Sequence, residues 1–327
     1  MRAAVRTALG QDWFVNLASR KRSHGVDAKL DRQIAAAIEM AELARLPKLE
    51  DMEVDEGRKF AAEGLSPFDP DPAPMAHVID TQVDKIPVRV YVPQHAGPDW
   101  VVYYHGGGGV IGSIATSDAA TRYLAQKTRC TFASVDYRLG PEDPHPAAIE
   151  DAFVAYAGML DRVPRGAHVA VGGDSFGGFL SVWVDHLARE RKVRQPDVQM
   201  LLYPVVDLTL TSPSLDRLAE GYILTKRLVH WFRDHYLKPS DDQKAASPWF
   251  WTDLRGSAPA VIATAGFDPL VDEGNAWAER LRAARVPVRH HCFESLVHGF
   301  VSMTGAVDAA RMAIDEVCAD LVQMLRS

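Results

Sequence analysis

The stretch HVAVGGDSFGG at residues 168–178 decides the fold. It contains the pattern G-x-S-x-G at Gly173, Ser175 and Gly177, between an apolar run typical of a strand and a pattern typical of a helix. Glycines on both sides of the serine remove the Cβ atoms that would clash in a sharp turn. Such a short pattern is weak evidence by itself, and a glycine-rich turn without chemistry is the alternative. Its place between a strand and a helix favours a nucleophile elbow, with Ser175 as the nucleophile.

Strand and helix patterns alternate on both sides of this elbow. Apolar runs that suit strands buried on both faces occur at 101–104, 131–135, 168–172, 198–203 and 260–265. Crossover helices fit the intervening stretches 115–128, 146–160 and 176–190. The remaining strands are expected at 76–82, 88–92 and 286–293, with a final helix at 306–325. This order predicts an α/β fold whose mostly parallel eight-stranded sheet carries helices on both faces.

A helical segment precedes the strands. Leu30 and Ile34 begin an apolar repeat with a spacing of four. Asp27 is placed to cap the start of this helix, and Pro47 follows its last periodic residue. Residues 64–74 contain four prolines, which exclude a helix or a central strand and predict a linker.

The second irregular segment lies between two predicted strands, at residues 207–250. It contains an amphipathic pattern after Thr225, a candidate N-cap, and we interpret it as an insertion above the strand ends. The expected organisation is a helical cap made of residues 1–62 and 207–247. An α/β catalytic domain is then made of residues 63–206 and 248–327.

A second chemical signal follows the strand at 101–104, where His105 leads into four consecutive glycines, 106–109. Such a run costs conformational entropy, so it suits a loop whose backbone N–H groups face a ligand closely. Acyl transfer needs donors of this kind for its oxyanion. The sequence here contains neither a G-K-[ST] motif nor a G-x-G-x-x-G arrangement together with its acidic partner, as a phosphate-binding loop would. We therefore predict an oxyanion loop, with plain loop flexibility as the alternative.

A serine nucleophile needs a base and an orienting acid, and the α/β-hydrolase order is Ser, acid, His. Asp268 lies where the strand at 260–265 opens into a loop, and His298 follows the last strand, so we expect these two residues to complete a triad. Asp272 is the rival acid, but its position before a helical pattern suits an N-cap. His290 and His291 are adjacent on a strand and point to opposite faces, so no metal site is expected there.

Composition restricts the remaining possibilities. The 327 residues are 47% hydrophobic and 24% charged, an ordinary globular balance. A formal charge of −7 disfavours nucleic acid as a partner. Three cysteines are too few for a disulfide framework, and neither a secretory signal nor an 18-residue apolar run occurs. We therefore expect a cytoplasmic protein without an integral membrane segment.

In order, the motifs resemble those of the bacterial hormone-sensitive-lipase-like esterases, the α/β-hydrolases of lipolytic family IV. The matching stretches are HGGG at 105–108, YRLGPEDPHPAAIED at 137–151, GDSFGG at 173–178, DPLVDEG at 268–274 and HGF at 298–300. The resemblance covers residues 76–327, and the segment before it is similar to the family's N-terminal cap helices. Five motifs in register are far more specific than any one of them.

The resemblance implies a serine carboxylesterase that acts on a small-molecule ester with a short- to medium-chain acyl group and needs no cofactor. It assigns the oxyanion donors to the backbone N–H groups of Gly107, Gly108 and Phe176. Within the stretch 137–151 it implies a structural role, in which Arg138 pairs with a nearby carboxylate. Dimers through the last strand occur in the family, so a homodimer is possible.

Two positions depart from the family pattern. Phe176 stands where this subgroup commonly has alanine, and its ring is expected to narrow one side of the pocket. Gly109 stands where a large residue is frequent, and we expect it to open space beside the oxyanion loop. Further candidates for the pocket wall come from the cap, with packing inside the cap as the alternative: Trp13, Phe14, Tyr222, Trp231 and Phe232.

Other activities stay open at this stage. An amidase, a peptidase or a transacylase uses the same triad, so the sequence does not separate them from an esterase. A non-catalytic receptor is a further alternative, because the plant gibberellin receptors resemble these esterases. Those receptors lack a complete triad, whereas all three candidate members are present here.

Overall fold

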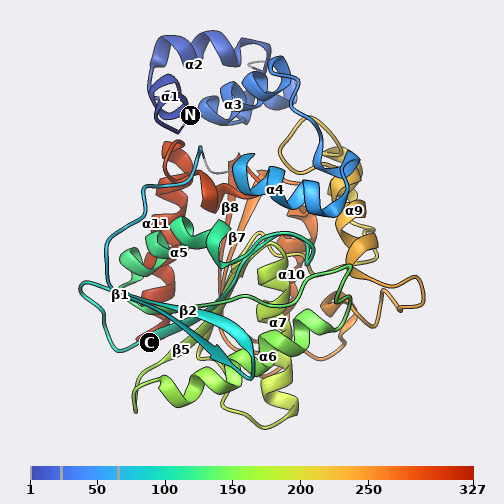
Figure 1. Ribbon diagram of the computed structural model, residues 1–327. Helices are drawn as coiled ribbons and strands as arrows, with labels where there is room; N and C mark the ends of the chain where they lie inside the picture. The colour runs from blue at the N-terminus through green and yellow to red at the C-terminus, as the bar shows by residue number, and fades with distance from the viewer. Residues whose placement is uncertain (1, 23–24, 65–66) are drawn as a thin grey trace.

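The sheet has the eight strands that were predicted, and their order across the sheet is β1-β2-β4-β3-β5-β6-β7-β8. It is seen in a computed structural model that describes residues 2–22, 25–64 and 67–327 (Figure 1). Small parts of the expected cap segment 1–62 and of the proline-rich linker lie outside the described residues. The strands are β1 Met75–Val83, β2 Ile86–Pro93, β3 Trp100–Tyr104, β4 Thr131–Val135, β5 Val169–Asp174, β6 Val198–Leu202, β7 Ala260–Phe267 and β8 Val288–Val297.

Pairing in the sheet changes from antiparallel to parallel along its width. The pairs β1–β2 and β2–β4 are antiparallel, and every pair from β4 to β8 is parallel. The carboxyl ends of these parallel strands therefore meet at one edge, where ligands bind in open α/β sheets. β8 extends beyond the predicted range to Val297 and ends directly before His298.

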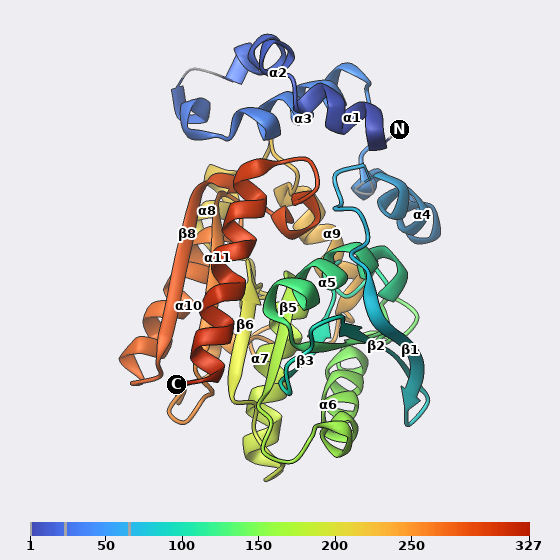
Figure 2. The same ribbon diagram turned by 90° about the vertical axis from the view of Figure 1, so that its left-hand side faces the viewer.

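Helices cover both faces of the sheet (Figure 2). One face packs against α5 Ile114–Thr128 and α11 Asp308–Leu325. The opposite face packs against α6 Ala147–Met159, α7 Phe176–Glu190 and α10 Val271–Ala283. Neighbouring residues of β3 show the alternation, because Tyr103 belongs to the first core and Val102 to the second. The predicted α/β layers are thus confirmed.

The helix starts correct two expectations. Asp31, not Asp27, caps α3 (Arg32–Leu43), and it accepts the N–H groups of Gln33 at 2.9 Å and Ile34 at 3.1 Å. Residues 25–29 form a 3-10 turn, so the α-helix begins after them. Asp272 lies in the first turn of α10 and pairs with Arg217 instead of capping the helix.

Thr225 was also predicted to cap a helix. Its side chain accepts the N–H of Leu228 at 3.0 Å, at the start of α9 (Lys226–Tyr236). This prediction is confirmed.

The N-terminal helices form a tier beyond one end of the sheet (Figures 1 and 2). They are α1 Arg2–Leu9, α2 Asp12–Ala18, α3 and α4 Val54–Gly64, and α4 lies between the other three and the sheet. The tier is attached to the carboxyl end of β8, where the Asp31 N–H donates to the Ser295 carbonyl at 2.9 Å. No helix of the described residues has the length and apolar character needed to cross a membrane.

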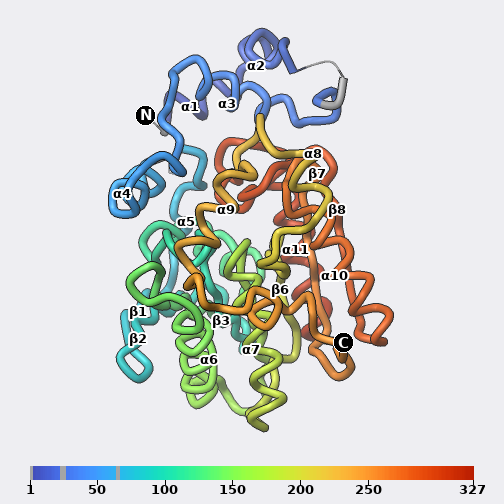
Figure 3. The backbone as a smooth tube through the Cα atoms, turned by 90° about the vertical axis from the view of Figure 1, so that its right-hand side faces the viewer, coloured from blue at the N-terminus to red at the C-terminus, as the bar shows by residue number. Residues whose placement is uncertain are grey.

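The inserted segment contains α8 Pro213–Arg217 and α9, and it reaches up to the N-terminal tier (Figure 3). Among the described residues, three side-chain hydrogen bonds join the two segments. They are Tyr222 Oη to Asp27 at 2.6 Å, Thr225 Oγ1 to Glu50 at 3.1 Å and Arg227 Nη2 to Asp51 at 2.5 Å.

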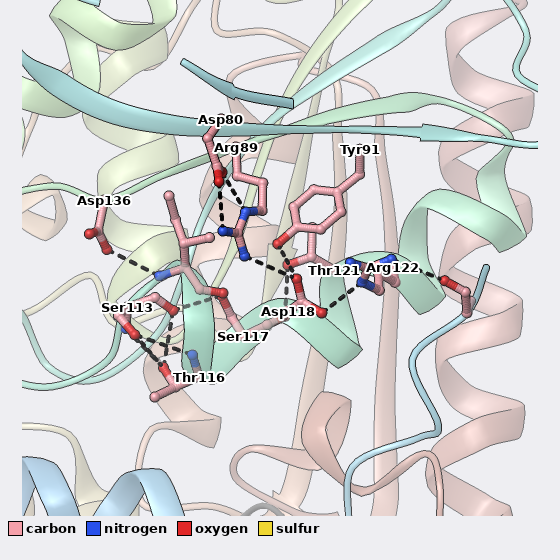
Figure 4. A network of polar contacts seen from close by, with 12 residues as sticks. Asp80, Arg89, Tyr91, Ser113, Thr116, Ser117, Asp118, Thr121, Arg122 and Asp136 are labelled. Carbon is pink, nitrogen blue, oxygen red and sulfur yellow. Dashed lines mark hydrogen bonds and ion pairs between the residues drawn. The ribbon is translucent and has the colours of Figure 1, made fainter. Parts of the chain in front are cut away.

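A polar network attaches the antiparallel edge of the sheet to α5 (Figure 4). Asp118 on α5 accepts hydrogen bonds from Tyr91 Oη at 2.8 Å and from Arg122 Nε at 2.6 Å. Arg89 on β2 reaches Asp118 at 3.5 Å and Asp80 on β1 at 2.6 Å. These five residues lie on β1, β2 and α5, so we assign their contacts to the fold and not to the site.

Candidate active site

Three predicted residues meet at the carboxyl edge of the sheet. Ser175 follows β5, Asp268 follows β7 and His298 follows β8. The His298 Nε2 atom lies 2.9 Å from Ser175 Oγ, and Nδ1 lies 2.7 Å from Asp268 Oδ2. The imidazole is 11% exposed and the carboxylate 1% exposed, so bulk water is largely excluded from the pair. This is the geometry that a base and its orienting acid require.

The turn that carries Ser175 is strained, as a nucleophile elbow requires. Its φ of 55° and ψ of −115° lie outside the regions that L-residues favour. The Ser175 N–H donates to the Leu202 carbonyl of β6 at 2.8 Å, which holds the turn against the sheet. A Cβ atom at Gly173 would lie 2.6 Å from the Tyr104 carbonyl oxygen, so only glycine fits there.

The glycine loop after β3 lies beside this turn. Gly107, Gly108 and Gly109 have φ values of 120°, 63° and 74°, which side chains rarely permit. The Gly107 carbonyl accepts the N–H groups of Val110 at 3.0 Å and Ile111 at 2.9 Å. A Cβ atom at Gly108 would overlap the Phe232 ring, so α9 packs directly on this loop.

Comparison with known proteins agrees with this geometry. A family profile for the α/β-hydrolase fold matches residues 101–302. The carboxylic ester hydrolase LipN of Mycobacterium tuberculosis is 41% identical over 251 residues, which are 71% of this chain and 67% of that protein. The chain belongs to the hormone-sensitive-lipase-like esterases.

Two further relatives extend the match. The ethyl acetate hydrolase of Pseudomonas putida is 30% identical over 317 residues, 90% of this esterase and 99% of that protein. Among solved structures, the hyperthermophilic esterase of Pyrobaculum calidifontis has a TM-score of 0.79 at 34% identity and covers 88% of this chain and 97% of its own. This esterase is therefore a carboxylic ester hydrolase.

Asp174 connects the turn that carries Ser175 to the glycine loop, and the sequence analysis missed it. Its Oδ1 accepts the Tyr103 hydroxyl at 2.8 Å and the Gly106 N–H at 3.0 Å. Burial raises the pKa of this carboxyl, while the hydrogen bond from Tyr103 acts in the opposite direction. Asp174 thus ties the elbow to the start of the glycine loop. Its position next to Ser175 in the motif was the available signal.

Tyr203 was also missed. It lies just after β6 with a φ of 37°, a strained value for a bulky residue. Its ring centroid is 4.7 Å from that of His298, with an angle of 58° between the planes. The hydroxyl accepts the Val301 N–H at 3.4 Å, and burial raises the pKa of the phenol. Tyr203 therefore supports one side of the imidazole.

The expected opening at Gly109 is absent, and that expectation was wrong. A Cβ atom at Gly109 would lie 2.8 Å from the Phe176 ring and 2.9 Å from Tyr236. Phe176 is 2% exposed, and its centroid lies 4.7 Å from the Tyr236 ring and 5.0 Å from the Phe179 ring. The two departures from the family pattern compensate each other, because the phenylalanine ring fills the space beside the glycine.

The five pocket candidates that the cap supplies lie in different places in the structure. Phe232 packs on the glycine loop, and Tyr222 packs on Phe267, next to Asp268, with 5.1 Å between ring centroids. Trp13 is 68% exposed and lines a shallow hollow with Phe14 that α1 and α2 form by themselves.

The fifth candidate, Trp231, borders a surface hollow between the two cap segments, beside Glu50. Only Phe232 and Tyr222 of the five are thus found against the site.

Other predicted residues have structural contacts. Arg138 pairs with Asp151 through Nε at 2.9 Å and Nη2 at 2.8 Å, which confirms the expected ion pair. His290 contacts Asn275 of α10 at 3.0 Å and His291 contacts Asp320 of α11 at 2.7 Å, so they do point to opposite faces. Among the described residues, no group of three His, Cys, Asp or Glu side chains is arranged to hold a metal ion.

Proposed function

We propose that this esterase hydrolyses short- to medium-chain acyl esters with Ser175, His298 and Asp268 as its catalytic triad. The observation that carries the proposal is the continuous chain of hydrogen bonds, 2.9 Å from serine to imidazole and 2.7 Å from imidazole to carboxylate. Asp268 also accepts the Leu270 N–H at 2.9 Å, which fixes the orientation of its carboxylate.

Acylation begins when His298 Nε2 takes the proton of Ser175 Oγ and the oxygen attacks the ester carbonyl. The Asp268 carboxylate stabilises the imidazolium that forms. The N–H groups of Gly107, Gly108 and Phe176 donate to the oxyanion, and the N-terminus of α7 adds the positive end of its dipole. The imidazolium then protonates the leaving alcohol as the carbon–oxygen bond breaks.

Deacylation repeats these steps with water as the nucleophile. His298 takes one water proton, the hydroxyl attacks the acyl-enzyme, and the same proton returns to Ser175 as the carboxylic acid leaves. The two half-reactions leave the side chains unchanged, so the residues of the site supply all the proton transfers.

We attribute the proposed preference for short acyl groups to the limited space beside the oxyanion loop. Phe232, Tyr236 and Phe176 pack against two of its glycines and fill that side of the site. The ethyl acetate hydrolase among the relatives is named for a short ester, which supports the same range.

We also propose that residues 1–62 and 207–247 form one cap over a catalytic domain of 63–206 and 248–327. The contacts of Tyr222, Thr225 and Arg227 with the N-terminal segment support this division.

A homodimer through β8 is a further proposal. It is supported by the position of β8 as the last of the eight strands, and sedimentation of the purified protein tests it.

The test is hydrolysis of p-nitrophenyl esters with acyl chains from two to twelve carbons. Ser175→Ala is expected to lower kcat by several orders of magnitude, because the nucleophile is lost. Ser240→Ala, at an exposed serine, is the matched control and should behave as wild type. Turnover near wild type in Ser175→Ala would contradict the triad, and a maximum beyond ten carbons would contradict the proposed chain length.

A further inference from the structure

A single arginine of the N-terminal segment reaches the loop that carries the proposed oxyanion donors. Arg58 lies on α4, and its Nε donates to the Val110 carbonyl at 2.9 Å. Its Nη2 donates to the Gly140 carbonyl at 3.0 Å, and both terminal nitrogens contact the Glu142 carboxylate at 2.7 Å. One guanidinium group thus binds two backbone carbonyls and one carboxylate of the catalytic domain.

The two residues whose carbonyls Arg58 binds are themselves hydrogen-bonded to the glycine loop. The Val110 N–H donates to the Gly107 carbonyl at 3.0 Å, and the Gly140 N–H donates to the Gly109 carbonyl at 2.8 Å. Arg58 therefore holds, through one residue on each side, the two ends of the stretch Gly107–Gly109.

This stretch depends on outside contacts for its shape. Glycine has more backbone freedom than any other residue, and three in succession here adopt positive φ values. An oxyanion donor is effective only when it already points to where the negative charge develops. Atoms outside the loop must therefore restrain it.

We propose that Arg58 is a positioning residue that holds the oxyanion loop in its catalytic geometry, so that the N-terminal segment forms part of the active site. The proposal rests on the function proposed above for Gly107 and Gly108. Arg58 touches neither the substrate nor the reacting atoms, and it acts through Val110 and Gly140.

Arginine is suited to this position and lysine is not. The planar guanidinium carries five N–H donors in a fixed fork, so it binds carbonyls on one side and a carboxylate on another. An ammonium group is a single point charge and cannot span these acceptors. Glu142 keeps the fork in place, and the ion pair lowers the pKa of that carboxyl to about 2.

The rival explanation is that Arg58 only anchors α4 to the catalytic domain. The two explanations differ in what they predict for the transition state. An anchor affects the stability of the fold, whereas a positioning residue affects stabilisation of the oxyanion. A trifluoromethyl ketone separates them, because addition of the serine to it produces a tetrahedral oxyanion that needs the same donors.

The experiment compares the wild-type protein with Arg58→Ala, Arg58→Lys and Lys59→Ala. Lys59 is the exposed neighbour on α4 and provides the matched control. For Arg58→Ala we expect kcat to fall about tenfold and the inhibition constant of the ketone to rise by about the same factor, with KM changed less than about twofold. Arg58→Lys should fall between Arg58→Ala and the wild type, and Lys59→Ala should equal the wild type.

Unchanged kcat and ketone affinity in Arg58→Ala, with only a lower melting temperature, would overturn the proposal. If Arg58→Ala does not fold, Arg58→Lys decides, since equal values for it and the wild type overturn the proposal as well. Ser175→Ala is measured in parallel. An inactive Ser175→Ala beside a fully active Arg58→Ala rejects only this inference, whereas an active Ser175→Ala rejects the proposed function itself.

Discussion

The two halves of the site are held in different ways. The proposed triad is fixed by its own strands, because Ser175, Asp268 and His298 each directly follow a strand of the parallel sheet. The glycine loop follows β3 and is also contacted by two other segments, through Arg58 of α4 and Phe232 of α9. The comparison teaches that the proposed nucleophile and base are placed by the α/β sheet, whereas the loop with the proposed oxyanion donors also contacts the proposed cap.

The largest expected effect lies on the triad side. Asp268→Asn should lower kcat by about 10³- to 10⁴-fold, because an amide does not stabilise the imidazolium and favours the wrong tautomer. Steady-state hydrolysis of p-nitrophenyl acetate measures it. Asp272→Asn is the control, since that carboxylate pairs with Arg217 on the surface, and its activity should stay near wild type. A larger loss in Asp272→Asn than in Asp268→Asn would reverse the assignment of the acid.

Asp174 connects the two halves, so its removal should affect both. Asp174→Ala leaves the Tyr103 hydroxyl and the Gly106 N–H without their acceptor, and we expect kcat to fall about 10- to 100-fold. Tyr103→Phe removes one of the two bonds and should cause a smaller loss. The variants are compared by kcat and by ketone affinity. An equal loss in both variants would show that the bond to Gly106 is unimportant.

A smaller effect is expected at the ring beside the base. Tyr203→Leu removes the aromatic ring that packs against His298 and leaves the imidazole less firmly positioned, so kcat should fall about three- to tenfold. Tyr203→Phe keeps the ring and should retain most of the activity. Steady-state hydrolysis of p-nitrophenyl acetate by the wild type and the two variants is the deciding measurement. Equal kcat values for all three proteins would show that Tyr203 does not support His298.

The smallest effect on activity is expected at Glu273, a buried residue of α10. Its Oε1 accepts the Val206 and Asp207 N–H groups, its Oε2 has no partner among the described residues, and burial raises its pKa to about 8. A raised carboxyl pKa gives stability that is complete below about 4.5 and is lost as pH rises through about 8. The melting temperature of Glu273→Gln should therefore change less with pH between 5 and 8 than that of the wild type.

The control for this prediction is Glu279→Gln, at an exposed site on the same helix. It should keep the wild-type slope of melting temperature against pH. If Glu273→Gln also keeps that slope, the buried carboxyl does not titrate in this range.

The difference between the halves also explains what could be predicted from the sequence. The residues of the proposed triad stand in short motifs that follow recognisable strands, so their order along the chain was sufficient to predict that they meet. Arg58 lies 52 residues before Val110 on a helix with many charges, and nothing local distinguishes it from a solvated arginine. The sequence pattern indicates only that Tyr203 ends a buried strand. It does not reveal the strained φ of this residue.

The error at Gly109 has the same origin. Gly109 and Phe176 were interpreted one at a time, as a gap and as an obstruction, although their atoms occupy adjoining space. Compensation of this kind depends on distances between segments, which a single sequence does not contain. The predicted cap at Asp27 was wrong for a local reason, since a 3-10 turn shifts the start of α3 past Asp27.

The helix α4 has a practical consequence for cap exchange between related esterases. The outer helices α1–α3 end before Val54, where α4 begins, and Arg58, which contacts the catalytic domain, lies on α4. A chimera joined just before Val54 replaces the outer helices and keeps the native clamp on the loop. A junction in the proline-rich linker imports a foreign α4, so under the proposed role of Arg58 we expect it to change turnover as well. The choice between these two crossover points therefore decides whether the native contacts of Arg58 with the loop are kept.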